Sequence, residues 1–251
     1  GNSRKGVKAI GVVNRGEEKG IIEIAKPIGV IGGVQPCTNP IVTPMANAMN
    51  AIKCRNAIIF TPHPRTINCS NVFLEKVYDH WSRNGVKFPE HIIQMYQPAD
   101  VEDIRSFMGA VDMVVATGGP GMVRSAYSSG RPSYGVGPGN VPCIFDRSID
   151  YSEALDKVIA GRIFDNGIIC AGEQSIIHPR EERQQIESLL RKKNCYIVES
   201  SQEIARLTDV LFHGEVISKE AVGKSVEWIA KQAKLNIPPG TQMLLVRVDE
   251  E

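Results

Sequence analysis

Residues 29–65 read GVIGGVQPCTNPIVTPMANAMNAIKCRNAIIFTPHPR, and their pattern indicates the fold class. It holds two short runs rich in Val and Ile, Gly29–Val34 and Asn56–Phe60, separated by a segment with helical spacing. Because both runs are largely apolar on both faces, they predict strands that are buried on either side, as in a parallel sheet. Two further runs of the same kind, His91–Tyr96 and Asp112–Ala116, extend the prediction to four strands.

Helices are predicted between these strands. In the first, Thr43 is expected to be the cap and Pro44 the first helical residue. Four apolar residues are expected to line one face of this helix: Met45, Ala48, Met49 and Ile52. A second helix is expected from Ile67 to Arg83, with Gly85 just past its end, and a third is expected to follow a cap at Asp100. This alternation predicts an α/β fold with a doubly wound parallel sheet.

Three loops are expected at the carboxyl ends of the strands, where doubly wound sheets bind ligands. They read QPCTNP after the first strand, TPHPR after the second and TGGPG after the fourth. In the first loop, the amide of Asn39 can donate a hydrogen bond to a developing oxyanion, or Asn39 is a turn or cap residue. In the third, glycines at a helix N-terminus suit a pyrophosphate, with a tight turn as the equal alternative.

The rest of the chain divides into three parts. Ile10–Ala25 is read as a β hairpin or arm, and the Gly- and Pro-rich stretch Gly130–Pro142 as a structured loop at a domain edge. A second α/β unit is expected to follow. Its predicted helices are Ser152–Arg162 and Glu181–Lys192, and its predicted strands are Ser175–His178, Cys195–Val198 and Met243–Val248.

Cys170 is the candidate nucleophile among six cysteines, none of which forms a CxxC pair. In a chain of this length they are read as reduced cytosolic thiols, and a cytoplasmic location is expected. A reactive thiolate needs room for substrate and a nearby oxyanion donor, and Gly167 and Gly172 provide space on either side of Cys170. The alternative is a buried thiol at the start of a strand.

Charge and composition exclude several classes of function. The formal net charge is +1 without a basic run, so neither a nucleic-acid nor a membrane-surface partner is expected. No stretch reaches the roughly 18 apolar residues of a membrane span. There is no P-loop, HExxH or GxSxG motif, and the five histidines lack metal-ligand spacing, so no metal site is expected.

Three stretches together resemble the aldehyde dehydrogenase superfamily: residues 25–65, 116–140 and 164–177. They are most similar to its CoA-acylating branch, which includes acetaldehyde, succinate-semialdehyde and sulfoacetaldehyde dehydrogenases. The resemblance implies that residues 27–145 are a Rossmann-like dinucleotide-binding domain, preceded by a β arm at 1–26. It also implies that residues 146–251 are part of a catalytic domain. Because members of the family are longer than this chain, the chain is expected to be a fragment.

The resemblance also assigns roles to residues. It implies that Cys170 attacks the aldehyde carbon, that Asn39 and the Cys170 backbone N–H hold the oxyanion, and that a thioester forms on Cys170. NAD is the expected cofactor, with NADP possible, and coenzyme A the expected co-substrate. The expected cofactor-binding residues are Thr38, Pro62, His63, Thr117, Gly118, Gly119, Gly137 and Gly139.

One departure from the hydrolytic members favours the acylating branch. Those members carry a water-activating glutamate in an ELGG-like segment, whereas the corresponding segment here is GVGPGN, without a carboxylate. Lacking a general base for water, a thioester on Cys170 should persist until a thiol arrives. Glu173 is not assigned this role, because it lies three residues beyond the cysteine.

Two other readings stay open: an acyl-phosphate reductase of the glutamate-semialdehyde type, and a non-catalytic nucleotide-binding module. The expected substrate is a short aliphatic aldehyde, with Arg124 or Arg131 available should it carry an anionic tail. A homodimer or a higher homo-oligomer is expected for the full-length protein.

Overall fold

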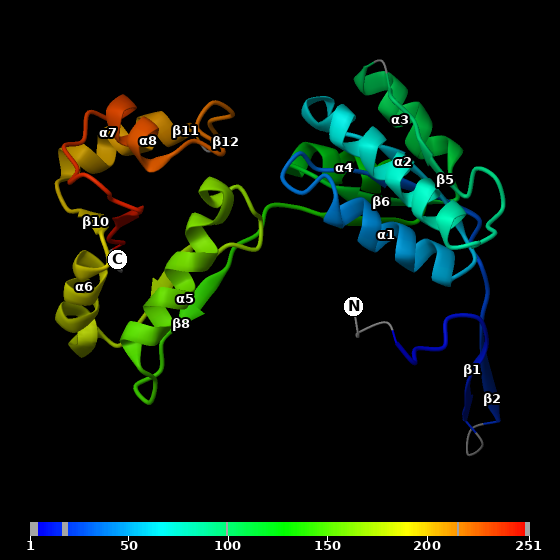
Figure 1. The fold of residues 1–251 in the computed structure, drawn as a ribbon, viewed down its shortest axis with the longest axis horizontal. Helices are drawn as coiled ribbons and strands as arrows, with labels where there is room; N and C mark the ends of the chain where they lie inside the picture. The colour runs from blue at the N-terminus through cyan, green and yellow to red at the C-terminus, as the bar shows by residue number, and fades with distance from the viewer. Residues whose placement is uncertain (1–4, 17–19, 99, 215, 249–251) are drawn as a thin grey trace. The chain divides into compact units, whose positions relative to one another are not determined.

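The computed structural model describes residues 5–16, 20–98, 100–214 and 216–248, and the chain separates into two compact units (Figure 1). The N-terminal unit is Gly1–Pro138 and the C-terminal unit is Gly139–Glu251. The sequence predicts the boundary between the two domains after residue 145. It lies earlier because β8 (Pro142–Ile144) pairs with β9 (Ser175–Ile177), which holds residues 142–144 in the C-terminal unit.

A five-stranded parallel sheet forms the centre of the N-terminal unit, with the strand order β5-β4-β3-β6-β7. The strands are β3 (Val30–Val34), β4 (Ala57–Thr61), β5 (Ile93–Met95), β6 (Met113–Thr117) and β7 (Ser133–Val136). The four predicted strands are confirmed to within a few residues at each end. The fifth, β7, lies in the stretch that was expected to be loop. It is an edge strand with Tyr134 66% and Val136 50% exposed, so it lacks the apolar signal of a buried strand.

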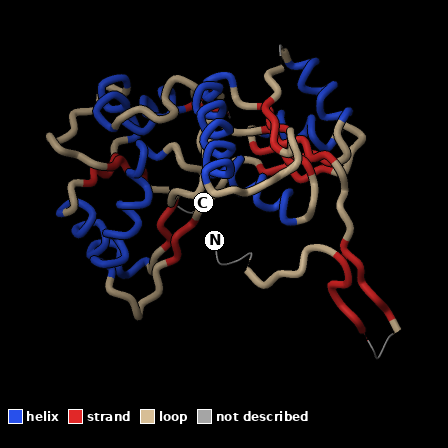
Figure 2. The backbone as a smooth tube through the Cα atoms, turned by 45° about the vertical axis from the view of Figure 1, so that its right-hand side comes forward, coloured by secondary structure: helices blue, strands red, loops and turns tan. Residues whose placement is uncertain are grey.

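Helices cover both faces of this sheet, as a doubly wound fold requires (Figure 2). α1 (Val42–Lys53) and α2 (Ile67–Arg83) pack on the face that carries Ile58 and Phe60. α3 (Val101–Ala110) and α4 (Pro120–Tyr127) pack on the opposite face, with Val114 and Ala116. Alternate residues of a strand point to opposite faces, so these two apolar clusters stay separate. The α/β prediction is confirmed, and α2 has its predicted bounds, with Gly85 at a φ of +63° beyond its end.

The start and the buried face of α1 differ from the prediction. The helix begins at Val42 without a side-chain cap from Thr43, and Pro44 is its third residue rather than its first. Of the predicted face, Ala48 is buried and Ile52 packs against the core, whereas Met45 and Met49 are each 43% exposed. The other buried residues of the helix are Pro44 and Ala51. Both faces of this helix are apolar, so spacing alone could not separate them, and the sheet accepts the smaller side chains.

The first residues form the predicted hairpin. β1 (Gly11–Gly16) pairs antiparallel with β2 (Ile21–Ala25), and the register shifts between Val12 and Asn14. Such a shift inserts an extra residue in one strand. The centre of the expected turn, residues 17–19, lies outside the described residues.

Two pairs of parallel strands organise the C-terminal unit. β8 pairs with β9, and β10 (Cys195–Val198) pairs with β13 (Met243–Val246). α5 (Tyr151–Ile163) and α6 (Arg183–Lys192) pack on these strands around Leu155 and Ile186. The remaining elements are η4 (Phe164–Gly167), η5 (Arg180–Glu182), α7 (Ser201–Leu211), β11 (Phe212–His213), β12 (Val216–Ile217) and α8 (Val226–Gln232). The predicted α/β pattern is confirmed, and β10 has its predicted bounds.

Within the part of the chain that the structure describes, no helix combines the length and the hydropathy needed to cross a bilayer.

Candidate active site

Three loops leave the carboxyl ends of β4, β3 and β6, which are neighbours in the sheet. The crossover from β3 to β4 passes through α1 on one face, and α3 leads into β6 on the other. The winding direction therefore reverses next to β3, and a crevice at such a point is where open α/β sheets bind ligands. Thr38, Asn39, Pro62, His63, Gly118 and Gly119 all lie in these loops, and Thr117 ends β6.

Asn39 makes a cap-type hydrogen bond at the start of α1. Its Oδ1 accepts from the backbone N–H of Val42 at 3.1 Å. The side chain is half-buried, and its Nδ2 amino group has no hydrogen-bond partner among the described residues. Because Oδ1 faces the Val42 N–H, the orientation of the side-chain amide is fixed, and the Nδ2 amino group remains available as a donor. Asn39 thus closes the turn that leads into α1, whose N-cap is Ile41, and it keeps an amide N–H that can donate.

The TGGPG loop presents an open helix N-terminus. Gly119 is the N-cap of α4 and Pro120 its first residue, so no side chain caps this helix. A side-chain atom built on Gly119 or Gly121 would meet nothing within 4 Å, whereas one on Gly118 would lie 3.2 Å from Met122 Cβ. The first N–H groups of a helix lack internal partners and attract anions. This end of α4 has room for a phosphate group.

The TPHPR loop after β4 is held by His63. Its Nδ1 accepts from the backbone N–H of Arg65 at 3.2 Å, which makes His63 the cap of the short turn η3 (Pro64–Thr66). Pro62 is buried beside it. His63 therefore helps to shape the loop. Because Nδ1 accepts the hydrogen bond from Arg65, the orientation of the imidazole ring is also fixed.

Cys170 lies on an exposed turn in the C-terminal unit, between η4 and β9. Three consecutive residues before it adopt left-handed backbone angles, with φ of +50° at Asp165, +52° at Asn166 and +70° at Gly167. The Asn166 side chain donates from Nδ2 to the carbonyl oxygen of Gly223 at 3.1 Å. Such backbone angles are rare outside glycine and persist only where the surroundings enforce them. The alternative of a buried thiol is wrong for this residue.

Glycines make close approaches around the same turn. A side chain at Gly139 would collide with the carbonyl oxygen of Cys170. One at Gly167 would lie 3.2 Å from Arg162 Cζ, and one at the buried Gly172 would lie 3.2 Å from the carbonyl oxygen of Ile169. Gly139 therefore packs directly against the cysteine turn, while Gly137 has open space around it.

Glu173 is turned toward α5. A side chain at Gly161 would collide with the Glu173 carboxyl group, whose Oε2 is buried without a hydrogen-bond partner among the described residues. Sequence reasoning missed this contact, because nothing in the spacing of Gly161 and Glu173 signals it. It also missed the bond from Asn166 to Gly223, whose partners are 57 residues apart.

The environments of the cysteines differ. Burial raises the pKa of Cys195 from 9.0 to about 11, despite the opposing effect of Lys193. Burial, followed by the charge of Glu173, also raises the pKa of Cys143. Both side chains therefore stay protonated at neutral pH. Cys170 and Cys69 are the exposed cysteines, and Cys69 lies within α2 rather than on a turn.

No group of three or more metal-ligating side chains occurs within the described ranges. The arrangement thus offers an exposed thiol on a turn in one unit. The other unit offers a free amide donor and an open helix terminus at the edge of a doubly wound sheet.

A sequence model of the aldehyde dehydrogenase family matches residues 4–240. The acetylating succinate-semialdehyde dehydrogenase of Clostridium kluyveri is 40% identical over 98% of this chain and 54% of its own length. The structure of an acetylating aldehyde dehydrogenase from Geobacillus thermoglucosidasius superposes with a TM-score of 0.88 at 33% identity, covering 99% of this chain and 55% of that protein.

A propionaldehyde dehydrogenase from Rhodopseudomonas palustris, solved with bound propionyl-CoA, superposes with a TM-score of 0.79 at 28% identity, covering 89% of this chain and 50% of that protein. The chain spans about half the length of the relatives that it matches. The family match extends over both units and nearly all of the sequence. The chain therefore belongs to the aldehyde dehydrogenase family.

Proposed function

We propose that this chain carries the cofactor-binding and nucleophilic parts of a CoA-acylating aldehyde dehydrogenase. The reaction converts a short aldehyde, coenzyme A and NAD(P)+ into an acyl-CoA and NAD(P)H, and it is reversible. The similar proteins from C. kluyveri and G. thermoglucosidasius are named as acetylating enzymes, and the one from R. palustris was solved with propionyl-CoA. These names support acyl transfer to coenzyme A as the chemistry of this chain.

In the proposed mechanism the Cys170 thiolate attacks the aldehyde carbon, and the carbonyl oxygen becomes an oxyanion. The Nδ2 of Asn39 and the backbone N–H of Cys170 donate hydrogen bonds to that oxyanion. Bound NAD(P)+ supplies an acceptor for the hydride that leaves the former aldehyde carbon. A thioester then remains on Cys170, and transfer of its acyl group to the thiol of coenzyme A releases Cys170 for the next cycle.

The residues present fit a dinucleotide. The N-terminus of α4 is open at Gly119 and Gly121, which suits a pyrophosphate. It follows β6 beside the point where the winding of the sheet reverses. The loop after β4 contains no acidic residue that would select the ribose hydroxyl of NAD+, so both NAD+ and NADP+ are proposed as cofactors.

The contact between Gly139 and the carbonyl oxygen of Cys170 is the observation that carries the acylating assignment. Gly139 lies near the end of the GVGPGN segment, and this segment lacks a carboxylate, which supports the proposal that water is not activated there. Glu173, the nearest acidic residue in the sequence, has its carboxyl group packed against Gly161 of α5. With no carboxylate on that segment to activate water, hydrolysis of the thioester should be slow, and the thioester should persist until a thiol attacks it.

The test uses the full-length protein that contains this chain, NAD+ or NADP+, and a panel of short neutral and anionic aldehydes. NADH or NADPH formation is followed with coenzyme A, with phosphate and with neither. We expect sustained turnover with coenzyme A only, and its loss in Cys170→Ser but not in the matched variant Cys69→Ser. Sustained turnover with neither acceptor would establish a hydrolytic enzyme instead, and turnover with phosphate alone would establish an acyl-phosphate reductase.

A further inference from the structure

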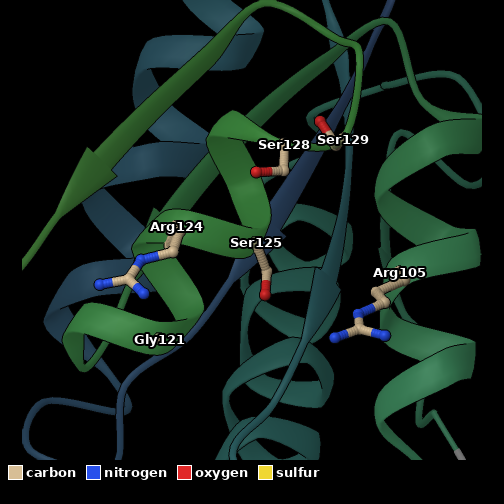
Figure 3. A pocket seen from close by; sticks show the side chains of 6 residues that line it. All are labelled: Arg105, Gly121, Arg124, Ser125, Ser128 and Ser129. Carbon is tan, nitrogen blue, oxygen red and sulfur yellow. The ribbon is translucent and has the colours of Figure 1, made fainter.

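The polar groove of the N-terminal unit and the cysteine turn of the C-terminal unit differ in how their side chains are arranged. The groove lies between α3 and α4 and has a volume of about 510 Å³. Its two arginines, Arg105 and Arg124, lie on opposite sides of Ser125 (Figure 3), so they do not converge on one ligand group. In the cysteine turn, by contrast, two contacts converge on a single residue, Gly223.

Asn166 makes the first of these contacts and Ile168 the second. The Nδ2 of Asn166 donates to the carbonyl oxygen of Gly223 at 3.1 Å. A side-chain atom built on Gly223 would lie 3.4 Å from Ile168 Cδ1, so Ile168 packs against the same residue. Gly223 also has a left-handed φ of +77°, which favours glycine. One residue thus contacts the turn on both sides of Gly167.

The segment that carries Gly223 is anchored independently of the turn. The backbone N–H of Ser218 donates to the carbonyl oxygen of Leu211 at 2.8 Å, and that of Ala221 donates to Ser218 at 3.2 Å. The side chains of Ser218 and Ala221 are buried. We call residues 218–224 the Gly223 platform. Because its own hydrogen bonds and burial hold it, the platform can fix the turn instead of following it.

The backbone of the turn needs such support. Asp165 and Asn166 are consecutive non-glycine residues with left-handed angles, φ 50° and ψ 43° for the first and φ 52° and ψ 33° for the second. Residues of this kind cost free energy, persist where their surroundings enforce them, and cluster at functional sites. The Asn166 side chain is exposed, and a single hydrogen bond there adds little to the free energy of unfolding. Its position on a strained turn therefore points to a role in geometry.

The other end of the turn is closed by contacts close to the cysteine. The backbone N–H of Gly172 donates to the carbonyl oxygen of Ile169 at 3.0 Å, and Gly139 packs against the carbonyl oxygen of Cys170. With this end closed, the contact of Asn166 with the platform determines where the beginning of the turn lies. The two ends together set the direction of the Cys170 backbone N–H.

We propose that Asn166 is a positioning residue, which holds the thiol and the backbone N–H of Cys170 in the geometry that oxyanion stabilisation requires. The proposal rests on the proposed function, because that function assigns the oxyanion to this N–H. Asn166 acts through the backbone of the turn and touches neither substrate nor cofactor. A displacement of about 1 Å at a reacting group can lower a rate by about 10²-fold, so a bond that contributes little to stability can contribute much to turnover.

Amide hydrogen exchange of the 251-residue chain tests the contact and requires no turnover. Asn166→Asp keeps the shape of the side chain but replaces the donor with an oxygen that faces the Gly223 carbonyl. Asn166→Gly removes the donor and keeps access to left-handed angles. We expect both variants to exchange the N–H groups of Ile168 and Gly172 roughly five-fold faster, with exchange at Ser218 unchanged.

Asn84→Asp is the matched control. Asn84 is also exposed, and its Nδ2 donates to a backbone carbonyl, that of His80 at the end of α2, at 2.7 Å. It should leave exchange in the cysteine turn unchanged. If Asn166→Asp does not fold, Asn166→Gly carries the test, because glycine adopts these backbone angles without strain.

Steady-state kinetics of the full-length protein with coenzyme A measure the consequence for turnover. We expect both Asn166 variants to lower kcat by roughly ten- to a hundred-fold. The KM values for the aldehyde and for coenzyme A should change by less than about three-fold, because Asn166 contacts neither molecule. A purely structural role would instead lower Tm and leave kcat of the folded protein unchanged.

Unchanged exchange at Ile168 and Gly172 in both variants would overturn the proposal. So would an unchanged kcat in a full-length protein that transfers acyl groups to coenzyme A, and in both cases the proposed function would stand. Faster exchange in these variants, combined with a natural full-length protein that does not turn over aldehydes, would refute the proposed function, while the contact of Asn166 with the platform would stand.

Discussion

Asn39 gives the sharpest prediction, because its two amide atoms have separate tasks. Oδ1 accepts from the Val42 N–H at 3.1 Å, and the proposed mechanism uses Nδ2 as an oxyanion donor. Asn39→Ala removes both functions. Asn39→Asp keeps an acceptor for Val42 and removes the donor. A carboxylate is also well tolerated at a helix N-terminus, so the Asp variant should keep the stability of the natural chain.

The expected magnitudes are different for the two atoms. Loss of the hydrogen bond that Asn39 Oδ1 accepts at the start of α1 costs about 1 kcal/mol. In a chain of this length that corresponds to a decrease in Tm of roughly 2–4 °C. Loss of one oxyanion donor lowers kcat by about 10²–10³-fold, or about 3–4 kcal/mol in the activation free energy. Asn39→Ala should therefore show both defects and Asn39→Asp the kinetic defect alone.

Thermal unfolding of the 251-residue chain, followed by circular dichroism, measures the first effect. Steady-state kcat of the full-length protein with coenzyme A measures the second. The reasoning is refuted if Asn39→Asp retains kcat within about three-fold of the natural protein, since an oxyanion donor is worth far more. An equal loss of Tm in both variants would refute the capping role.

Three further predictions concern the C-terminal unit. At neutral pH a thiol-alkylating reagent should label Cys170 well before Cys143 and Cys195, as followed by peptide mass spectrometry, and rapid labelling of Cys195 would contradict its burial. Because the pKa of Cys195 is raised from 9.0 to about 11, its contribution to stability is complete below pH 9.0 and is lost as the pH rises toward about 11. Cys195→Ala should thus reduce the slope of the free energy of unfolding against pH in that window. An unchanged slope, with the free energy measured by urea unfolding at each pH, would count against this. Gly167→Ala should destabilise the chain by about 1–2 kcal/mol, because Gly167 has a left-handed φ and faces Arg162, and equal unfolding midpoints would exclude that constraint.

Local patterns in the sequence were enough for much of the fold. The bounds of α2 and β10 follow from helical spacing, glycine placement and apolar runs, which act over a few residues. Asp100 caps α3 as predicted, accepting from the Asp103 N–H at 2.9 Å. The three loops at the carboxyl edge of the sheet could also be placed, because parallel strands leave their loops on one edge.

The sequence did not show which face of α1 is buried or that residues 133–136 form a strand, and both depend on tertiary packing. Apolar residues surround much of α1, and packing on the sheet buried Pro44 and Ala51 beside the predicted Ala48, while Met45 and Met49 stayed exposed. β7 has an exposed, mixed sequence, and its strand conformation comes from pairing with β6. Edge strands are stabilised by their partner's hydrogen bonds more than by their own pattern.

For the candidate site, the sequence alone determined which residue types are present: a cysteine between glycines, an Asn-Pro loop and a glycine-rich helix start. The folded chain was needed to see that Cys170 is exposed, that Gly139 packs against it and that Asn166 connects its turn to Gly223. The physical reason is distance along the chain. Local spacing encodes contacts within a few residues, whereas these contacts join segments 31 to 57 residues apart, which only the packed chain brings together.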